Sequence, residues 1–278
     1  MNSPLINAAE LWAQIQNHQA PLIYDCRFDL AKPESGHDAY LMGHIPGAAY
    51  VHLDRDLSGP KNGHNGRHPL PDFSSWHQTC LRLGITHQQS IVIYDHQYGA
   101  FACRMWWMLK ASGIQRVQVL NGGFESWLKA GLPTDSGAQH HPTTEQLDVE
   151  PFHGVINSAA VLANLQDRQF QILDARAPDR FMGENETLDP VGGHIPGALN
   201  RFFRNNLDSH GLFKDPQVLA EEFKALSSDL ELVHQCGSGV TACHNIFAMA
   251  LAGIDSAKLY AGSWSEWCSE PTRPIAKN

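Results

Sequence analysis

The phrase Gly-His-Ile-Pro-Gly-Ala occurs twice in this chain, at residues 43–48 and again at residues 193–198. A second pair of matching segments lies further along each half, LNGGFESW at residues 120–127 and YAGSWSEW at residues 260–267. The matching segments follow one another in the same order and at nearly the same spacing in both halves. Internal similarity on this scale predicts two copies of one domain.

Short apolar runs alternate with helical patterns in both copies. The runs LIYDC (22–26) and SIVIYD (90–95) of the first half correspond to QILDAR (171–176) and LELVHQC (230–236) of the second. The expected helices span residues 7–17, 73–83, 100–112, 216–226 and 240–252. This alternation predicts an α/β fold in which each copy is a parallel β-sheet flanked by helices.

A polar stretch broken by prolines, PTDSGAQHHPTTEQLDVEPF at residues 133–152, separates the two copies. Such a composition is typical of a linker between domains. We therefore expect a first domain over residues 1–135, a linker over 136–150 and a second domain over 151–278.

The composition is that of an ordinary globular protein, with 42% hydrophobic and 18% charged residues among 278. The net charge of −9, without a run of Lys or Arg, argues against nucleic acid or an anionic membrane as partner. Neither a signal peptide nor a membrane span is expected, which points to the cytoplasm. Six dispersed cysteines then predict free thiols, and the scattered histidines predict no metal site.

The expected site of chemistry is the carboxyl end of the last apolar run in the second half. Ligands of open parallel sheets bind at that edge, and here the run ends in Cys236. Gly237 and Gly239 follow, and then a helix begins. Glycines let successive N–H groups turn toward one centre, and the helix adds its positive end, so the loop predicts an anion cradle that stabilises a thiolate. The first half carries Asp95 at the corresponding position.

Cysteine phosphatases use the same plan of strand, cysteine loop and helix. They require an arginine six residues after the cysteine to clamp the phosphoryl oxygens. That position is Ala242 in this chain, which disfavours phosphatase activity.

The repeat, the two Gly-His-Ile-Pro-Gly-Ala phrases, CGSGVTA (236–242) and YAGSWSEW together resemble the rhodanese superfamily over nearly the whole chain. The resemblance implies two tandem rhodanese-like domains with the site in the cleft between them. It also implies that only the second domain carries the nucleophile, in agreement with Asp95 in the first. Within the family, the chain is most similar to sulfurtransferases that use 3-mercaptopyruvate.

The resemblance also implies how the donor is recognised. Relatives that prefer thiosulfate, a dianion, typically carry Arg-Lys after the cysteine, whereas this loop continues with neutral Gly237 and Ser238. The carboxylate of 3-mercaptopyruvate would then be bound by Arg176 and Arg180, whose guanidinium groups suit bidentate recognition. The backbone of the loop, Gly237, Gly239 and Val240 included, would cradle the sulfur, and Thr241 would donate to the substrate or the persulfide.

An Asp–His–Ser arrangement that manages the donor's thiol proton is implied by the same family. Matching the phrases gives Asp54, His68 and Ser238. The glycine-rich stretch PKNGHNGRHPLP (60–71) also carries His64, so either histidine could serve, with His68 favoured by the Leu-Pro that follows. His52 stands where the family often has another acid and is left unassigned.

The implied reaction is covalent catalysis in two displacements, with Cys236 as the sulfur carrier and no metal or organic cofactor. The acceptor would be a thiol such as thioredoxin or glutathione, or cyanide. Two alternatives stay open: a thiosulfate:cyanide sulfurtransferase, and a noncatalytic module that relays sulfur to a protein partner. The physiological acceptor, the biological purpose and the oligomeric state do not follow from the sequence.

Overall fold

The computed structural model describes residues 3–96, 98–226 and 230–277. The chain forms two compact units. The first comprises residues 1–58, 71–153 and 209–213, and the second comprises residues 59–70, 154–208 and 214–278. Each unit therefore takes one short segment from the sequence half that mainly builds the other. Two continuous domains were expected from the sequence, without this exchange of segments.

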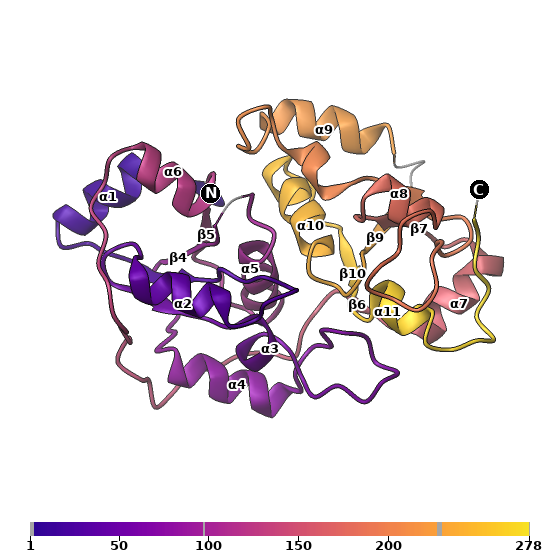
Figure 1. Cartoon of the computed structure of the whole chain (residues 1–278), viewed down its shortest axis with the longest axis horizontal. Helices are drawn as coiled ribbons and strands as arrows, with labels where there is room; N and C mark the ends of the chain where they lie inside the picture. Colours follow the sequence, from indigo (N-terminus) through magenta and orange to yellow (C-terminus); the bar gives the residue numbers. More distant parts are fainter. Residues whose placement is uncertain (1–2, 97, 227–229, 278) are drawn as a thin grey trace. The chain divides into compact units, whose positions relative to one another are not determined.

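The first unit contains a five-stranded, fully parallel sheet in the order β1-β5-β4-β2-β3. Its strands are β1 (Leu5–Ile6), β2 (Leu22–Asp25), β3 (Ala48–Tyr50), β4 (Ile91–Tyr94) and β5 (Val117–Leu120). Its helices are α1 (Ala8–Gln16), α2 (Ser35–Met42), α3 (Leu53–Asp56), α4 (Phe73–Arg82), α5 (Ala102–Ala111) and α6 (Gly123–Lys129) (Figure 1).

The second unit repeats this topology with the order β6-β10-β9-β7-β8, again fully parallel. Its strands are β6 (Val155–Ile156), β7 (Phe170–Asp174), β8 (Leu199–Asn200), β9 (Glu231–Gln235) and β10 (Lys258–Tyr260). Its helices are α7 (Ser158–Asp167), α8 (Pro178–Met182), the 3₁₀ helix η1 (Phe203–Asn206), α9 (Pro216–Lys224), α10 (Ala242–Leu251) and α11 (Ser263–Trp267). The predicted α/β class and the repeat are confirmed.

Local sequence explains where the elements begin. The Asn7 side chain accepts from the N–H of Glu10, whose carboxylate accepts from the N–H of Asn7, so α1 starts with a capping box. Asn157 caps α7 in the matching position of the second unit. Strands β2 and β4 are buried along their whole length, as expected of central strands covered on both faces.

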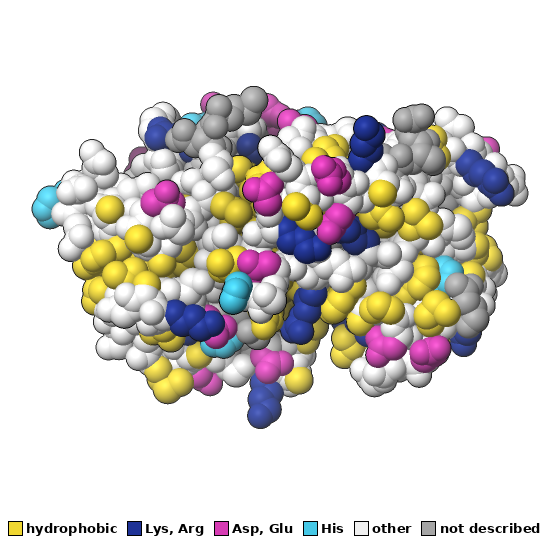
Figure 2. Space-filling model, turned by 90° about the horizontal axis from the view of Figure 1, so that it is seen from above, with side chains coloured by type: hydrophobic (Ala, Val, Ile, Leu, Met, Phe, Trp, Pro, Cys, Tyr) yellow, Lys and Arg dark blue, Asp and Glu magenta, His cyan; other side chains and the backbone are white. Residues whose placement is uncertain are grey.

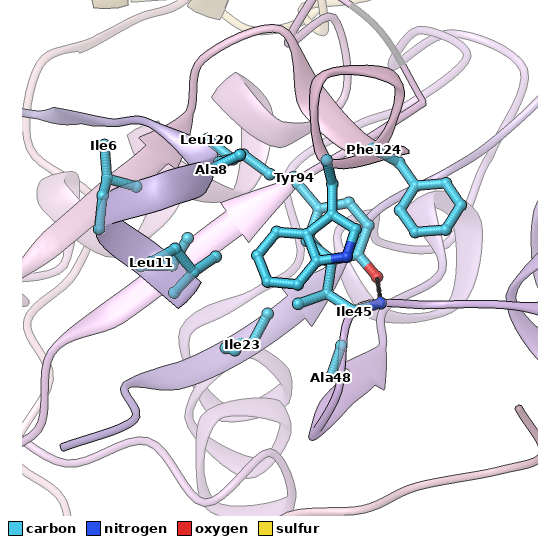
Figure 3. Close-up of a cluster of buried hydrophobic side chains, with 11 residues drawn as sticks. Ile6, Ala8, Leu11, Ile23, Ile45, Ala48, Tyr94, Leu120 and Phe124 are labelled. Carbon is cyan, nitrogen blue, oxygen red and sulfur yellow. Dashed lines mark hydrogen bonds between the residues drawn. The ribbon is translucent and has the colours of Figure 1, made fainter. Parts of the chain in front are cut away.

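The core of the first unit explains the Gly-His-Ile-Pro-Gly-Ala phrase. Tyr94 lies among buried aliphatic side chains, and its hydroxyl accepts a hydrogen bond from the N–H of Ile45 at 3.2 Å (Figure 3). His44 is fully buried, bonds the carbonyl oxygen of Tyr40 at 2.9 Å and stacks on its ring. His194 does the same with Phe181 in the second unit. The phrase thus fixes a turn in each copy, and its histidine serves the fold.

The surface bears charges of both signs. On the face in Figure 2, Lys and Arg side chains are interspersed with Asp and Glu. Within the described part of the chain, no helix is long and apolar enough to cross a membrane. No group of His, Cys, Asp and Glu with the makings of a metal site occurs among these residues either.

Candidate active site

Cys236 follows β9 directly and begins the loop that leads into α10. The thiol is buried, with the residue 2% exposed, and the N–H of Ser238 points at the sulfur at 3.5 Å. Gly239 has φ +76°, and a Cβ there would overlap the carbonyl oxygen of Ala261. Only glycine fits this position without strain, so the tight turn under the sulfur depends on it.

The start of α11 holds the cysteine loop from the other side. The Ser263 hydroxyl accepts from the N–H of Cys236 at 3.1 Å, and the N–H of Trp264 donates to the carbonyl oxygen of Cys236 at 3.0 Å. The N–H of Ser265 donates to the carbonyl oxygen of Gly237 at the same distance. The GSWSEW segment therefore fixes the backbone that carries the nucleophile, which gives the second repeated phrase a physical role.

His68 lies beside Ser238, as the sequence analysis expected. Nδ1 of His68 is 2.7 Å from Oγ of Ser238, and both residues are buried. His68 belongs to residues 59–70, which are part of the second unit and are anchored there by the bond from the N–H of Arg67 to Ser265 at 3.0 Å. The alternative, His64, is exposed, so the geometry favours His68.

Arg176 is engaged within the fold. Its Nε and Nη2 donate to the Asp174 carboxylate, Nη2 also donates to the carbonyl oxygen of Gly193, and the guanidinium lies 4.7 Å from the Trp264 ring centre. Burial opposes the charge, but Asp174 raises the pKa of the Arg176 guanidinium above its usual value. The side chain is 1% exposed.

The first unit contains the same Asp-x-Arg arrangement, although Asp95 stands at the position that matches Cys236. Arg27 bonds Asp25 and the carbonyl oxygen of Gly43, and its guanidinium lies 4.3 Å from the centre of the Phe124 ring. The Asp-x-Arg motif makes the same main contacts in both copies, which indicates a structural role, and Arg176 in addition lies 3.5 Å from the Glu186 carboxylate. Beside this structural role, the binding of a substrate carboxylate by Arg176 stays a prediction of the sequence.

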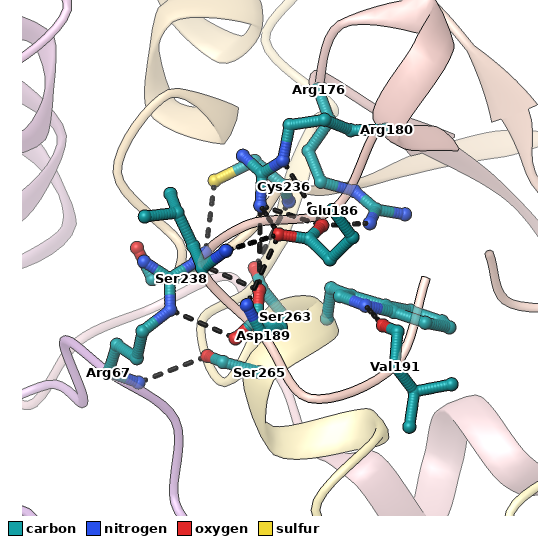
Figure 4. Close-up of polar contacts among 12 residues, drawn as sticks. Arg67, Arg176, Arg180, Glu186, Asp189, Val191, Cys236, Ser238, Ser263 and Ser265 are labelled. Carbon is teal, nitrogen blue, oxygen red and sulfur yellow. Dashed lines mark hydrogen bonds and ion pairs between the residues drawn. The ribbon is translucent and has the colours of Figure 1, made fainter. Parts of the chain in front are cut away.

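Arg180 lies at the cysteine loop and is one-fifth exposed. Its Nη2 donates to Oε1 of Glu186 at 2.7 Å and lies 3.5 Å from the Asp189 carboxylate. Burial alone would raise the pKa of the Glu186 carboxyl, but hydrogen bonds from Arg180 and two backbone N–H groups hold it below its usual range. Figure 4 shows Arg180, Glu186 and Asp189 close to Cys236.

Three charged residues of this site were missed by the sequence analysis: Arg67, Glu186 and Asp189. Nε and Nη2 of Arg67 donate to the two oxygens of Asp189 at 2.9 and 3.0 Å (Figure 4). The carboxylates of Glu186 and Asp189 are 4% and 3% exposed. Glu186 and Asp189 both belong to residues 184–189, the segment between α8 and the second Gly-His-Ile-Pro-Gly-Ala phrase.

The remaining predicted residues divide between the units. Val240 is buried, and Thr241 precedes the first residue of α10, at the half-buried edge of the loop. Asp54 belongs to the first unit, in the first turn of the short helix α3, and is half-buried. Its partnership with His68 and Ser238 stays a prediction of the sequence.

The first unit shows what the loop becomes without a nucleophile. The Asp95 carboxylate accepts from the N–H groups of Gly99, Phe101 and Ala102 at 3.1, 2.8 and 3.2 Å. In the first unit the N–H groups after the strand are therefore satisfied by the chain's own anion. Burial raises the pKa of Asp95 to about 6, against the effect of these hydrogen bonds and with a contribution from Asp25.

The raised pKa of Asp95 should make the stability of the wild-type protein depend on pH, and the variant Asp95→Asn, whose side chain does not titrate, provides the comparison. Between about pH 4 and 6 the native carboxyl binds more protons than the unfolded one, so wild-type stability falls as the pH rises. Relative to the variant, the free energy of unfolding should drop by about 2–3 kcal/mol over this interval. Urea unfolding of the wild type and the variant from pH 4 to 7 measures this difference in the free energy of unfolding. A difference that stays constant with pH would contradict the proposed titration.

The family model "Rhodanese-like domain" matches residues 7–130 and residues 158–270. These two matches cover the helices of both units and all strands except the first of each sheet, β1 and β6. The chain therefore belongs to the rhodanese-like domain family and carries two copies of that domain.

The known proteins to which this chain is similar include sulfurtransferases for two different donors. The chain is 42% identical over 280 residues to "Probable 3-mercaptopyruvate sulfurtransferase" of Pseudomonas aeruginosa, covering 99% of this chain and 98% of the relative. It is 40% identical to "Putative thiosulfate sulfurtransferase SseB" of Mycobacterium tuberculosis, covering 98% and 96%. Among solved structures, SseA from Escherichia coli, described with the 3-mercaptopyruvate sulfotransferases, superimposes with a TM-score of 0.82 at 30% identity, covering 95% of this chain and 99% of SseA.

Proposed function

We propose that this protein is a sulfurtransferase that takes sulfur from 3-mercaptopyruvate, holds it as a persulfide on Cys236 and passes it to a thiol or to cyanide. The observation that carries the proposal is the pairing of Cys236, in its glycine-bounded loop, with the hydrogen-bonded side chains of Ser238 and His68. The names of the similar proteins from P. aeruginosa and E. coli support the choice of donor.

In the first displacement, the Cys236 thiolate attacks the sulfur of the donor thiol. A sulfur–sulfur bond forms and the carbon–sulfur bond breaks, leaving its electron pair on the former carbon neighbour as the enolate of pyruvate. Protonation of the enolate gives pyruvate. That proton is the one the donor thiol gives up, so no net proton is consumed, and the enzyme is left as the persulfide anion of Cys236.

The Ser238–His68 pair supplies the proton path for this step. At 2.7 Å, the hydroxyl and the imidazole are within reach for proton transfer through a hydrogen bond. His68 would relay the donor's thiol proton through Ser238 toward the enolate carbon. Asp54 would orient His68, as the family resemblance predicts. Arg180, at the edge of the same loop, would hold the carboxylate of the donor.

In the second displacement, an acceptor thiolate or cyanide attacks the outer sulfur. The sulfur–sulfur bond breaks and its electron pair returns to Cys236 as the thiolate, while the acceptor leaves as a persulfide or as thiocyanate. Backbone N–H groups of the loop stabilise the anionic sulfur in both steps, the N–H of Ser238 among them. A thiol acceptor such as thioredoxin or glutathione and a location in the cytoplasm belong to the same proposal.

Thiosulfate is the competing donor because the relative from M. tuberculosis is named as a thiosulfate sulfurtransferase. The two donors should be compared at equal cyanide concentration in one buffer, by their values of kcat/KM. We expect a preference for 3-mercaptopyruvate of about 100-fold, equivalent to roughly 2.7 kcal/mol in transition-state binding. A preference for thiosulfate would keep Cys236 as the sulfur carrier but refute the proposed donor.

A further inference from the structure

Two guanidinium groups lie over the residue that follows the nucleophile. A Cβ placed on Gly237 would stand 2.7 Å from Nη2 of Arg67, and 3.5 and 3.6 Å from Nη2 and Nη1 of Arg180. Arg67 comes from residues 59–70 and Arg180 from α8, yet both belong to the second unit. The loop carries no cation in its own sequence, but two cations reach it from elsewhere in the fold.

This proximity explains the glycine at position 237. Gly239 needs its left-handed φ of +76°, but Gly237 is absent from the glycines with positive φ. Its backbone would accept any residue. A side chain would instead displace the end of Arg67, so glycine at this position lets the guanidinium groups lie close to the sulfur-carrying loop.

Asp189 holds Arg67 in place while leaving part of it available. The bidentate contact uses Nε and Nη2, so the Nη1 edge lies outside it. The Arg67 side chain is 26% exposed, whereas the carboxylate of Asp189 is 3% exposed. A buried acid that orients a partly exposed arginine is a means of presenting a fixed guanidinium to a ligand.

We infer that Arg67 is a donor-recognition residue, which binds the anionic group of the sulfur donor together with Arg180 above Gly237. Asp189 is the positioning residue that orients both guanidinium groups. Because the carboxylates of Glu186 and Asp189 offset the positive charges of Arg67 and Arg180, the two arginines supply directional hydrogen bonds with little net charge. Such a pair suits the single carboxylate of 3-mercaptopyruvate better than a dianion. The inference rests on the proposed sulfur transfer but requires only that the donor be anionic.

The test separates the two half-reactions in the variant Arg67→Met, which keeps an unbranched, flexible side chain and removes its charge. The donor half is the second-order rate of persulfide formation from 3-mercaptopyruvate, measured at low donor concentration. The acceptor half is the rate at which neutral dithiothreitol removes sulfur from preloaded enzyme. Arg82→Met is the matched control, because Arg82 also pairs with an aspartate but lies exposed in the first unit.

We expect Arg67→Met to slow the donor half by about 10–100-fold, as befits a lost charge-assisted hydrogen bond, and the acceptor half by less than about threefold. Arg67→Lys, which keeps the charge and loses the bidentate geometry, should fall between wild type and Arg67→Met. Arg82→Met should change neither rate.

Equal slowing of both halves would identify Arg67 as merely structural, and an unchanged donor half would remove it from the site; either outcome overturns the inference. If wild type is loaded by thiosulfate instead of 3-mercaptopyruvate, the proposed donor fails, and the same split measured with thiosulfate still decides the role of Arg67. If Cys236→Ser still transfers sulfur, the proposed function itself fails.

Discussion

Replacing Cys236 with serine is expected to lower kcat for sulfur transfer by about 10³-fold or more, because Cys236 begins the glycine loop and is the proposed sulfur carrier. A serine hydroxyl is a far weaker nucleophile and cannot form a persulfide. The variant should fold normally, since the change is small and a serine oxygen can also accept from the N–H of Ser238, which lies 3.5 Å from the sulfur. Initial rates of thiocyanate formation from 3-mercaptopyruvate and cyanide give the comparison.

Cys80→Ala is the matched control for this experiment. Cys80 is a buried cysteine of α4 in the first unit, and burial raises the pKa of its thiol above the usual range. Its loss should leave kcat within about threefold of wild type. Retention of activity in Cys236→Ser together with a loss in Cys80→Ala would move the chemistry to the first unit and contradict the account.

The largest effect on stability is expected from Asp174→Ala. The substitution leaves the guanidinium of Arg176 buried, 1% exposed, without its principal counter-ion. Removing one partner of a buried ion pair costs about 3–5 kcal/mol. Asp25→Ala should have a similar effect in the first unit, because Arg27 makes the equivalent contacts. Urea unfolding, followed by the fluorescence of the buried tryptophans, measures both.

Glu125→Ala provides the comparison for these two variants. Glu125 pairs with Lys129 on the surface of α6, and both side chains are well exposed. Exposed pairs of this kind contribute little to stability, so the unfolding midpoint should scarcely move. If Asp174→Ala and Asp25→Ala were as mild as Glu125→Ala, the Asp-x-Arg motif would not be the structural element that its repeated geometry indicates.

The repeat made the fold predictable from the sequence. Each apolar run and helical pattern occurs twice, so one copy checks the other, and the five expected helices agree with α1, α4, α5, α9 and α10 to within about two residues at each end. Cys236 could be singled out because its loop combines signals that act locally: a strand end, two glycines and a helix start. The pairing of His68 with Ser238 came from the family resemblance rather than from such a local signal.

The charged groups around the loop could not be predicted in the same way. Arg176 and Arg180 stand four residues apart and look equivalent as cations in the sequence. In the structure, however, Arg176 forms a buried ion pair with Asp174. Arg67 lies far away in the sequence, in a segment that the fold assigns to the second unit. The acidic stretch ENETLD at residues 184–189 was a possible signal, since buried acids near a site of expected cations imply ion pairs. Its partner on residues 59–70 emerges only from the tertiary structure.

The most direct test of sulfur transfer through Cys236 is to treat the enzyme with 3-mercaptopyruvate in the absence of an acceptor and to analyse its peptides by mass spectrometry after alkylation. The account predicts the gain of one sulfur atom on the peptide that contains Cys236, formation of an equal amount of pyruvate, and loss of that sulfur on addition of cyanide. Pyruvate formation without sulfur on Cys236, or sulfur on another of the six cysteines instead, would contradict it.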